Sequence, residues 1–206
     1  MISEIIGGAW KGLKAEFWLL VGLIIGYVII AMFLSLFIPD MKEGITITAI
    51  AIAVLSIVFS LIFTLGYTKN LFQALDKEEP QFSAYGRQSL KLITYLIAYL
   101  IYFITVTIGT ALLIVPGVYL ALRLQFFQAS IVDENAGIIG SFKRSWEITK
   151  GQTLSLFLLM LIMTGIYILG FLVVGIGIFV AIPFTGLMYC FTFRKLTLPV
   201  INLNTD

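Results

Sequence analysis

Histidine is absent from this chain of 206 residues, and cysteine occurs once, as Cys190. Without histidine, the chain lacks the side chain that most often binds zinc or shuttles protons near neutral pH. A single cysteine excludes an internal disulfide, and the apolar surroundings of Cys190 favour a buried side chain over a reactive thiol. We therefore expect no metal centre and no cofactor.

Charged residues are also scarce, at 12% of the sequence, whereas soluble domains average about 25%. Hydrophobic residues make up 60%, more than a soluble domain of this length hides in its own core. The net charge of +2 and the lack of a basic run interleaved with aromatic residues argue against nucleic acid as a partner. The composition predicts an all-α integral membrane protein, a helical bundle that has the lipid bilayer as its partner.

Three uncharged apolar runs reach the length of about 20 residues that a transmembrane helix needs. They are Phe17 to Phe37, Ile45 to Tyr67 and Leu92 to Val115. The apolar stretch from Gly151 to Phe193 is about twice that length and contains glycines and a proline, so we expect two helices that turn near Gly175. In the first run, Gly22 and Gly26 have the spacing of a close helix–helix contact.

The segment Val118 to Val132 decides the topology, because it is short for a span and carries Arg123. If it crosses, there are about six transmembrane helices and both termini are cytoplasmic. Only Lys42 then lies on the outer side, as the positive-inside rule favours. The cytoplasmic basic residues are Lys11, Lys14, Lys69, Lys77, Arg87, Lys91, Lys143, Arg144, Lys150, Arg194 and Lys195.

Two segments, Met1 to Phe17 and Ile138 to Lys150, are amphipathic when projected on a helix, and Asn135 is placed to cap the second. A weaker example is Phe82 to Lys91. Helices with a basic polar face and a boundary tryptophan lie in the headgroup plane, where they favour anionic lipids of the cytoplasmic leaflet. The expected membrane-contacting residues are Trp10, Lys11, Lys14, Phe142, Lys143, Arg144 and Trp146.

The chain is expected to form a single membrane domain, 1–206, in which an interfacial helix precedes each of three hairpins. This order fits a threefold internal repeat, but also any multi-pass protein with basic amphipathic cytoplasmic loops. The expected parts are an interfacial helix (1–16), a first hairpin (17–67), a cytoplasmic loop with an interfacial helix (68–91), a second hairpin (92–133), an interfacial helix (134–151), a third hairpin (152–193) and a cytoplasmic tail (194–206).

Arg123 is the one charged residue that the sequence places inside a span, and an ionisable group there is a candidate functional residue. In one interpretation its side chain snorkels, or bonds carbonyl groups freed near Pro116. In the other it holds an anion, such as a phosphate or a carboxylate, with both arms of the guanidinium.

Asp133 and Glu134 form an acidic turn, and Glu147 follows on the polar face of the next helix. Neighbouring carboxylates can bind a divalent cation or act as acid and base, but acidic residues also stabilise the start of a helix. The sequence has no P-loop, nucleophile elbow or zinc-protease pattern, so we assign no catalytic residue. The candidate ligand-binding residues are Arg123, Asp133, Glu134 and Glu147.

Three neighbouring motifs follow one another: LIVPGVYLALR at 113–123, IVDENAGII at 131–139 and SFKRSWEITKG at 141–151. They resemble a bacterial family of multi-pass membrane proteins that includes the membrane domain of glycerophosphoryl diester phosphodiesterases. The resemblance implies a six-span domain of the bacterial inner membrane with an arginine in its fourth span. It does not imply phosphodiesterase activity, because in fused members that chemistry resembles a separate soluble barrel with histidine and carboxylates.

Three functions follow from these observations. The missing nucleophiles favour a non-catalytic membrane domain that anchors, scaffolds or regulates envelope components. The alternatives are a transporter or lipid-handling protein with an anion contact at Arg123, and an intramembrane enzyme that uses the carboxylates on lipid headgroups. Other membrane proteins, or a second copy of the chain, are the expected protein partners.

Overall fold

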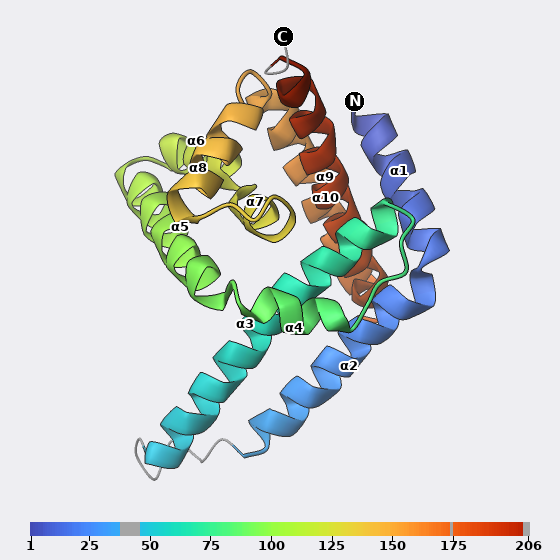
Figure 1. Ribbon diagram of the computed structural model, residues 1–206, viewed down its shortest axis with the longest axis vertical. Helices are drawn as coiled ribbons and strands as arrows, with labels where there is room; N and C mark the ends of the chain where they lie inside the picture. Colours follow the sequence, from blue (N-terminus) through green and yellow to red (C-terminus); the bar gives the residue numbers. More distant parts are fainter. Residues whose placement is uncertain (38–45, 174, 204–206) are drawn as a thin grey trace.

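The structure is a computed structural model that describes residues 1–37, 46–173 and 175–203, with side chains up to residue 198. Over these ranges the chain forms ten helices and no strand, so the all-α prediction is confirmed (Figure 1). The helices are α1 (Ile2–Ala15), α2 (Phe17–Ser35), α3 (Ile47–Leu75), α4 (Ser83–Ser89), α5 (Leu92–Leu112), α6 (Ile114–Leu124), α7 (Phe127–Asp133), α8 (Ile138–Ile148), α9 (Thr153–Leu172) and α10 (Ile178–Leu203).

Five helical segments in the described ranges are long and apolar enough to cross a membrane. Four are α2, α3, α5 and α9, and the fifth joins α6 to α7 as Ile114–Asp133. The chain is therefore a helical membrane protein. The expected turn near the glycines is also confirmed, because α9 and α10 are separate helices and Gly175 lies between them with a φ of 71°.

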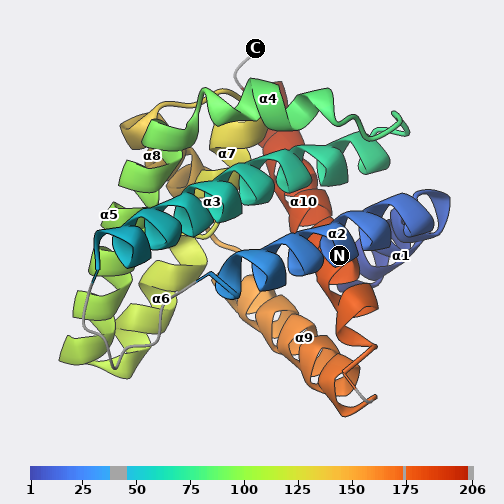
Figure 2. The ribbon, with the colours of Figure 1, turned by 90° about the horizontal axis from the view of Figure 1, so that it is seen from below.

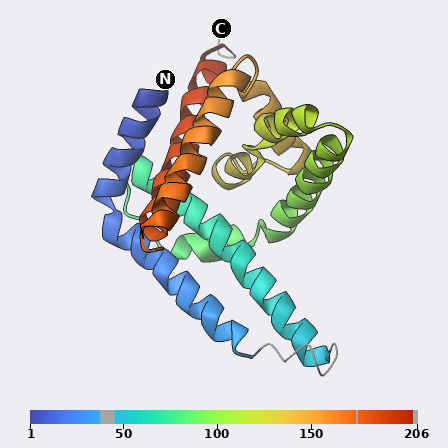
Figure 3. The same cartoon turned by 180° about the vertical axis from the view of Figure 1, so that it is seen from behind.

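A short helix precedes each of three helical hairpins. Helix α1 leads into α2 and α3, α4 leads into α5 and the α6–α7 segment, and α8 leads into α9 and α10. The α2–α3 hairpin extends away from the rest of the molecule in Figure 1, and the α5–α6 and α9–α10 hairpins diverge in Figure 2. From behind, α1 lies beside α10 (Figure 3), with which it makes extensive contact.

The core lies at one end of the bundle, where α1, α3, α7 and α10 meet. Aromatic rings fill its centre: the Phe72 and Phe193 centroids are 5.8 Å apart, and Phe126 lies 6.0 Å from Phe193. Buried residues of α3 begin only at Leu65, and the apolar side chains in the first half of this helix are exposed or half-buried. In a membrane protein that surface is available to lipid.

Glycines shape the hairpins at particular places. A Cβ atom on Gly117 would collide with Thr110, so the absence of a side chain at this position lets α5 and α6 approach closely. The expected helix contact at Gly22 and Gly26 is not present within the described residues, because no atom would lie within 4 Å of a Cβ at either position. Both glycines instead line an open groove.

Candidate functional site

The fourth candidate span is interrupted between Leu124, where α6 ends, and Phe127, where α7 begins. A break inside a membrane protein frees main-chain polar groups that need new partners. Ser145 of α8 is the partner of two such groups. Its hydroxyl donates to the carbonyl oxygen of Arg123 at 2.8 Å and accepts from the main-chain amide of Phe126 at 3.1 Å. One serine thus joins the two halves of the span.

Tyr189 of α10 makes a second bridge of the same kind. Its hydroxyl donates to the carbonyl oxygen of Gln125 at 2.9 Å and accepts from the amide of Ala129 at 3.3 Å. In α7, the side-chain amide of Gln128 donates to the hydroxyl of Thr68 in α3 at 2.7 Å. The broken span is therefore fixed by hydrogen bonds to three other helices, α3, α8 and α10.

Arg123 is only 3% exposed, and among the described residues it has no ion pair. Its guanidinium carbon lies 4.3 Å from the centre of the Trp146 ring and 6.0 Å from that of Tyr119. Its Nε–H has no hydrogen-bond partner. Aromatic faces attract a cation without a counter-charge, so this stack ties α6 to α8.

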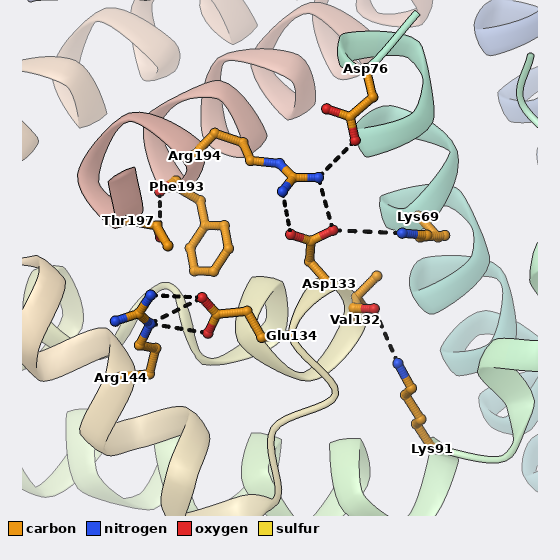
Figure 4. Close-up of polar contacts among 10 residues, drawn as sticks. All are labelled: Lys69, Asp76, Lys91, Val132, Asp133, Glu134, Arg144, Phe193, Arg194 and Thr197. Atoms are coloured by element: carbon orange, nitrogen blue, oxygen red, sulfur yellow. Dashed lines mark hydrogen bonds and ion pairs between the residues drawn. The ribbon is translucent and has the colours of Figure 1, made fainter. Parts of the chain in front are cut away.

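Asp133, at the end of α7, is the centre of an ion-pair network (Figure 4). Its side chain is 8% exposed and is held by both arms of Arg194, at 3.1 and 3.2 Å. The ammonium of Lys69 lies 3.6 Å away, and Arg194 also donates to Asp76 at 2.7 Å. The Asp133 carboxylate therefore pairs at once with a cation from α3 and a cation from α10.

Glu134 pairs with a different basic residue from those that hold Asp133. Arg144 of α8 donates three hydrogen bonds to its carboxylate, at 2.9, 3.0 and 3.1 Å. Beside this pair, the Lys91 ammonium donates to the carbonyl oxygens of Ile131 at 2.9 Å and Val132 at 3.0 Å. A positive charge at the last carbonyls of α7 is favourable.

The four candidate ligand-binding residues do not form one site. The carboxylates of Asp133 and Glu134 point to different basic partners (Figure 4). Arg123 lies beside Trp146, on the other side of the break in the span. Glu147 is exposed on α8, in a shallow pocket with Trp146.

On α1, the residues expected to contact the membrane lie around a helix that is already packed on the protein. Ile5, Ala9 and Leu13 are buried there. Trp10 is 46% exposed, with one edge against Phe184 at a centroid distance of 5.7 Å. The ammonium of Lys14 lies over the Trp10 ring at 5.3 Å, and Lys11 is exposed.

On α8, the buried side holds Ser141, Ser145 and Ile148. Phe142 is half-buried and stacks on Phe127, with 5.6 Å between the ring centres. The other expected contact residues differ in exposure, because Lys143 and Trp146 are exposed whereas Arg144 is held by Glu134.

The expected cap of α8 is wrong. Gly137 is the N-cap residue, and Asn135 lies in the preceding turn with a φ of 56°. Asparagine tolerates this left-handed conformation better than most residues, which accounts for its place in the turn.

Sequence reasoning did not find Lys69, Ser145, Tyr189 or Arg194 as site residues. Lys69 and Arg194 had a detectable signal, because each lies at a helix end that the sequence predicts to be cytoplasmic, but their shared partner Asp133 is distant in sequence. Ser145 and Tyr189 had none, because nothing in the sequence shows where the fourth span breaks.

An apolar groove of about 590 Å³ runs between α2, α3 and α4. Its wall includes Gly22 and Gly26 from α2, Phe63 from α3, Phe82 just before α4, and Tyr85 from α4. Because no side chain covers the two glycines, the groove is open along α2.

Comparison with known proteins gives one match. A family model described as a domain of unknown function (DUF7847) matches residues 86–204, more than half of the chain, from α4 to α10. No curated protein and no solved structure matches the chain. The match carries no link to the phosphodiesterase membrane domain that the motifs resemble, so that relationship stays a prediction.

Proposed function

This chain belongs to the DUF7847 family, and we propose that it is a non-catalytic membrane domain that anchors, scaffolds or regulates other components of the cell envelope. The observation that supports this most directly is that two of the three candidate carboxylates form ion pairs within the protein. Asp133 is held by Lys69 and Arg194, and Glu134 is held by Arg144. These two carboxylates, which the sequence marks as candidates for chemistry, instead form ion pairs that join helices.

We further propose six spans, with α10 as the sixth and with both termini in the cytoplasm of a bacterial cell. The start of α1 and the end of α10 lie at the same end of the molecule, where Glu4 pairs with Lys195. The ion-paired residues Lys69, Arg144 and Arg194 gather in the same region as the end of α7 (Figure 4). The positive-inside rule favours the cytoplasm for that side.

The exposed basic and aromatic residues of α1 and α8 support contact with anionic lipid. Lys11, Lys14 and Lys143 are exposed, and Trp10 and Trp146 are each more than a third exposed. Such residues anchor helices at the headgroup level of the cytoplasmic leaflet.

Photo-cross-linking in native membranes tests the scaffold function. A photoreactive amino acid at Lys143, on the exposed face of α8, should give the same protein adduct in independent preparations. At Ile104, which is exposed in the middle of α5, the matched control should give lipid adducts. Lipid adducts alone at Lys143 and at further exposed positions of α8 would contradict the proposal.

The absence of catalysis has a separate test. Glu147→Gln combined with Glu134→Gln removes two carboxylates that an enzyme acting on headgroups would need. Cells that carry the double variant should have the phospholipid composition of the wild type. A composition like that of cells without the chain would show that these carboxylates support turnover.

Lipid handling is the second candidate, and the apolar groove favours it. A cavity of about 590 Å³ that lies between membrane helices is large enough to hold part of an acyl chain. Gly26→Leu would narrow it, because Gly26 lines the groove and a Cβ there meets no atom within 4 Å. Loss of lipid transfer between vesicles in this variant, with folding intact, would favour lipid handling over a scaffold.

Transport through an anion contact at Arg123 receives less support from the geometry. The guanidinium is buried against Trp146, and Arg123 lines none of the pockets described above. Arg123→Leu should therefore affect folding before any uptake. Loss of anionic solute uptake in proteoliposomes, with unchanged thermal stability, would restore this alternative.

A further inference from the structure

A polar cavity of about 370 Å³ lies between the end of α3, the loop that follows it, α4 and the turn after α7. Its size is within the range of about 300–1,000 Å³ that is typical of small-molecule pockets. Helix α4 separates it from the apolar groove: Phe82 and Tyr85 line the groove, whereas Ala84, Arg87 and Gln88 line the cavity.

The lining of this cavity is biased toward positive charge. Lys69, Arg87 and Lys91 are basic, and Glu78 is the one acidic residue in the lining. Lys69 also pairs with Asp133 outside the lining, so three positive charges face two negative charges and the net charge is +1. The other polar lining residues are the amides Gln73, Gln81, Gln88 and Asn135. Cations surrounded by neutral amides form a site for an anion.

Arg87 is positioned without being neutralised. Its Nη2 donates to the Oε1 of Gln81 at 3.1 Å and to the hydroxyl of Ser83 at 3.1 Å. Among the described residues it has no carboxylate partner within ion-pair distance. The charge of Arg87 is therefore available to an anion, and the two neutral acceptors fix the orientation of its guanidinium.

Lys91 also has no carboxylate within ion-pair distance among the described residues, because its ammonium bonds the two carbonyl oxygens at the end of α7. Burial lowers the pKa of Lys91, and the positive charge of nearby Lys69 lowers it further, while Asp133 acts in the opposite direction. A bound anion would relieve the repulsion between the two lysines.

Gln88 adds a buried polar group at the cavity wall. Its side chain is 6% exposed, and its Oε1 has no hydrogen-bond partner in the described part of the chain. A buried amide group without a partner costs free energy. A ligand that donates a hydrogen bond to this oxygen, such as the hydroxyl group of a phosphate ester, would remove this cost.

We propose that this cavity binds a phosphate group, carried either by a lipid headgroup or by a soluble phosphate ester. Phosphate offers several acceptor oxygens, which suits an arginine fork with two lysine ammonium groups better than a single carboxylate does. The chemistry of the site depends on its lining alone. The lipid source also rests on the cytoplasmic orientation proposed above, which would place the cavity at headgroup level.

Binding by matched variants tests this proposal. The full chain in detergent micelles is titrated with inorganic phosphate and with glycerol 3-phosphate. For the lipid source, the chain is reconstituted in nanodiscs of phosphatidic acid in phosphatidylcholine. Loosely bound lipid is then removed from the protein, and the lipid that the protein retains is identified by mass spectrometry. The variants are Arg87→Gln and Lys91→Gln, and the control is Lys143→Gln, which makes the same charge change on exposed α8 outside the cavity.

We expect Arg87→Gln to weaken phosphate binding at least about tenfold, because one charge-assisted contact is lost. Lys91→Gln should do the same, and its melting temperature is measured because it also removes the contact with α7. Retention of phosphatidic acid that falls in both variants supports the lipid source, and binding of glycerol 3-phosphate alone supports the soluble one. Wild-type affinity in Arg87→Gln, an equal loss in Lys143→Gln, or equal binding of acetate would overturn the proposal.

The outcome is independent of the scaffold test. Phosphate binding that depends on Arg87 would support the site even if Lys143 cross-links only lipid. A protein adduct at Lys143 would likewise support the scaffold function if the cavity bound no phosphate.

Discussion

Arg123 is buried, and in the described part of the chain no carboxylate lies within ion-pair distance of it; its surroundings explain how the protein tolerates this. The ring of Trp146 offers a negative face 4.3 Å from the guanidinium carbon. The main-chain carbonyl oxygen of Arg123 accepts from the hydroxyls of Ser145 at 2.8 Å and Thr149 at 3.2 Å. Both the side chain and the main chain of Arg123 thus contact α8 and help to hold α6 against it.

Ser145→Ala should destabilise the chain by about 1–3 kcal/mol, because it leaves the buried amide of Phe126 without a partner and the carbonyl oxygen of Arg123 with the longer bond from Thr149 alone. Ser141→Ala is the matched control on the same helix. Ser141 is equally buried, but its hydroxyl bonds only the carbonyl group of Ile138 in its own helix. Thermal unfolding in detergent measures both variants, and equal melting temperatures would show that the bridge contributes nothing.

At the scale of elements, the α5–α6 hairpin depends on Gly117. Gly117→Ala places a Cβ atom against Thr110, with the Cα of that residue 2.6 Å away, so the two helices must move apart. We expect a loss of about 1–3 kcal/mol, as for overpacked cores. Gly165→Ala is the control, because nothing lies within 4 Å of its Cβ and alanine favours a helix. A hairpin that accepts both substitutions equally would contradict the described contact.

The sequence predicts the helices well where hydropathy alone decides them. The runs that contain α2, α3, α5 and α9 are uncharged over about the thickness of a bilayer, so the apolar interior of the membrane determines where these helices lie in the sequence. The turn between α9 and α10 follows from glycines that interrupt one long run.

Features that depend on contacts between helices were not predictable in the same way. The break between α6 and α7 is stabilised by Ser145 and Tyr189, which lie far along the chain from Phe126. The cap of α8 was missed because Asn135 suits both a cap and a left-handed turn. Asp133 and Glu134 were found as residues, but their separate partners Arg194 and Arg144 were not.

At the scale of the whole molecule, one ion cluster joins all three hairpins. Lys69 comes from α3, Asp133 from α7 and Arg194 from α10 (Figure 4). The hairpins diverge away from this region (Figure 2), so the cluster and the aromatic core beneath it hold their common end together.

Asp133→Asn should therefore weaken the packing of the three hairpins together. We expect a loss of about 2 kcal/mol, less than the 3–5 kcal/mol for a fully buried pair because Arg194 is partly exposed. Asp76→Asn is the control, since Asp76 is exposed and pairs with the same arginine. A melting temperature that falls no further in Asp133→Asn than in Asp76→Asn would contradict the role of the cluster.

The placement of the ion cluster and of the basic cavity on the cytoplasmic side is the central claim, because the scaffold, the lipid contacts and the lipid source of the phosphate all depend on it. Labelling of single cysteines by a membrane-impermeant maleimide tests it most directly. In a Cys190→Ala background, Glu79→Cys marks the loop after α3, and Leu113→Cys marks the turn between α5 and α6; both positions are exposed. We predict that Glu79→Cys is labelled only in inside-out vesicles and Leu113→Cys only in right-side-out vesicles, whereas labelling of Glu79→Cys from the outside would contradict the claim.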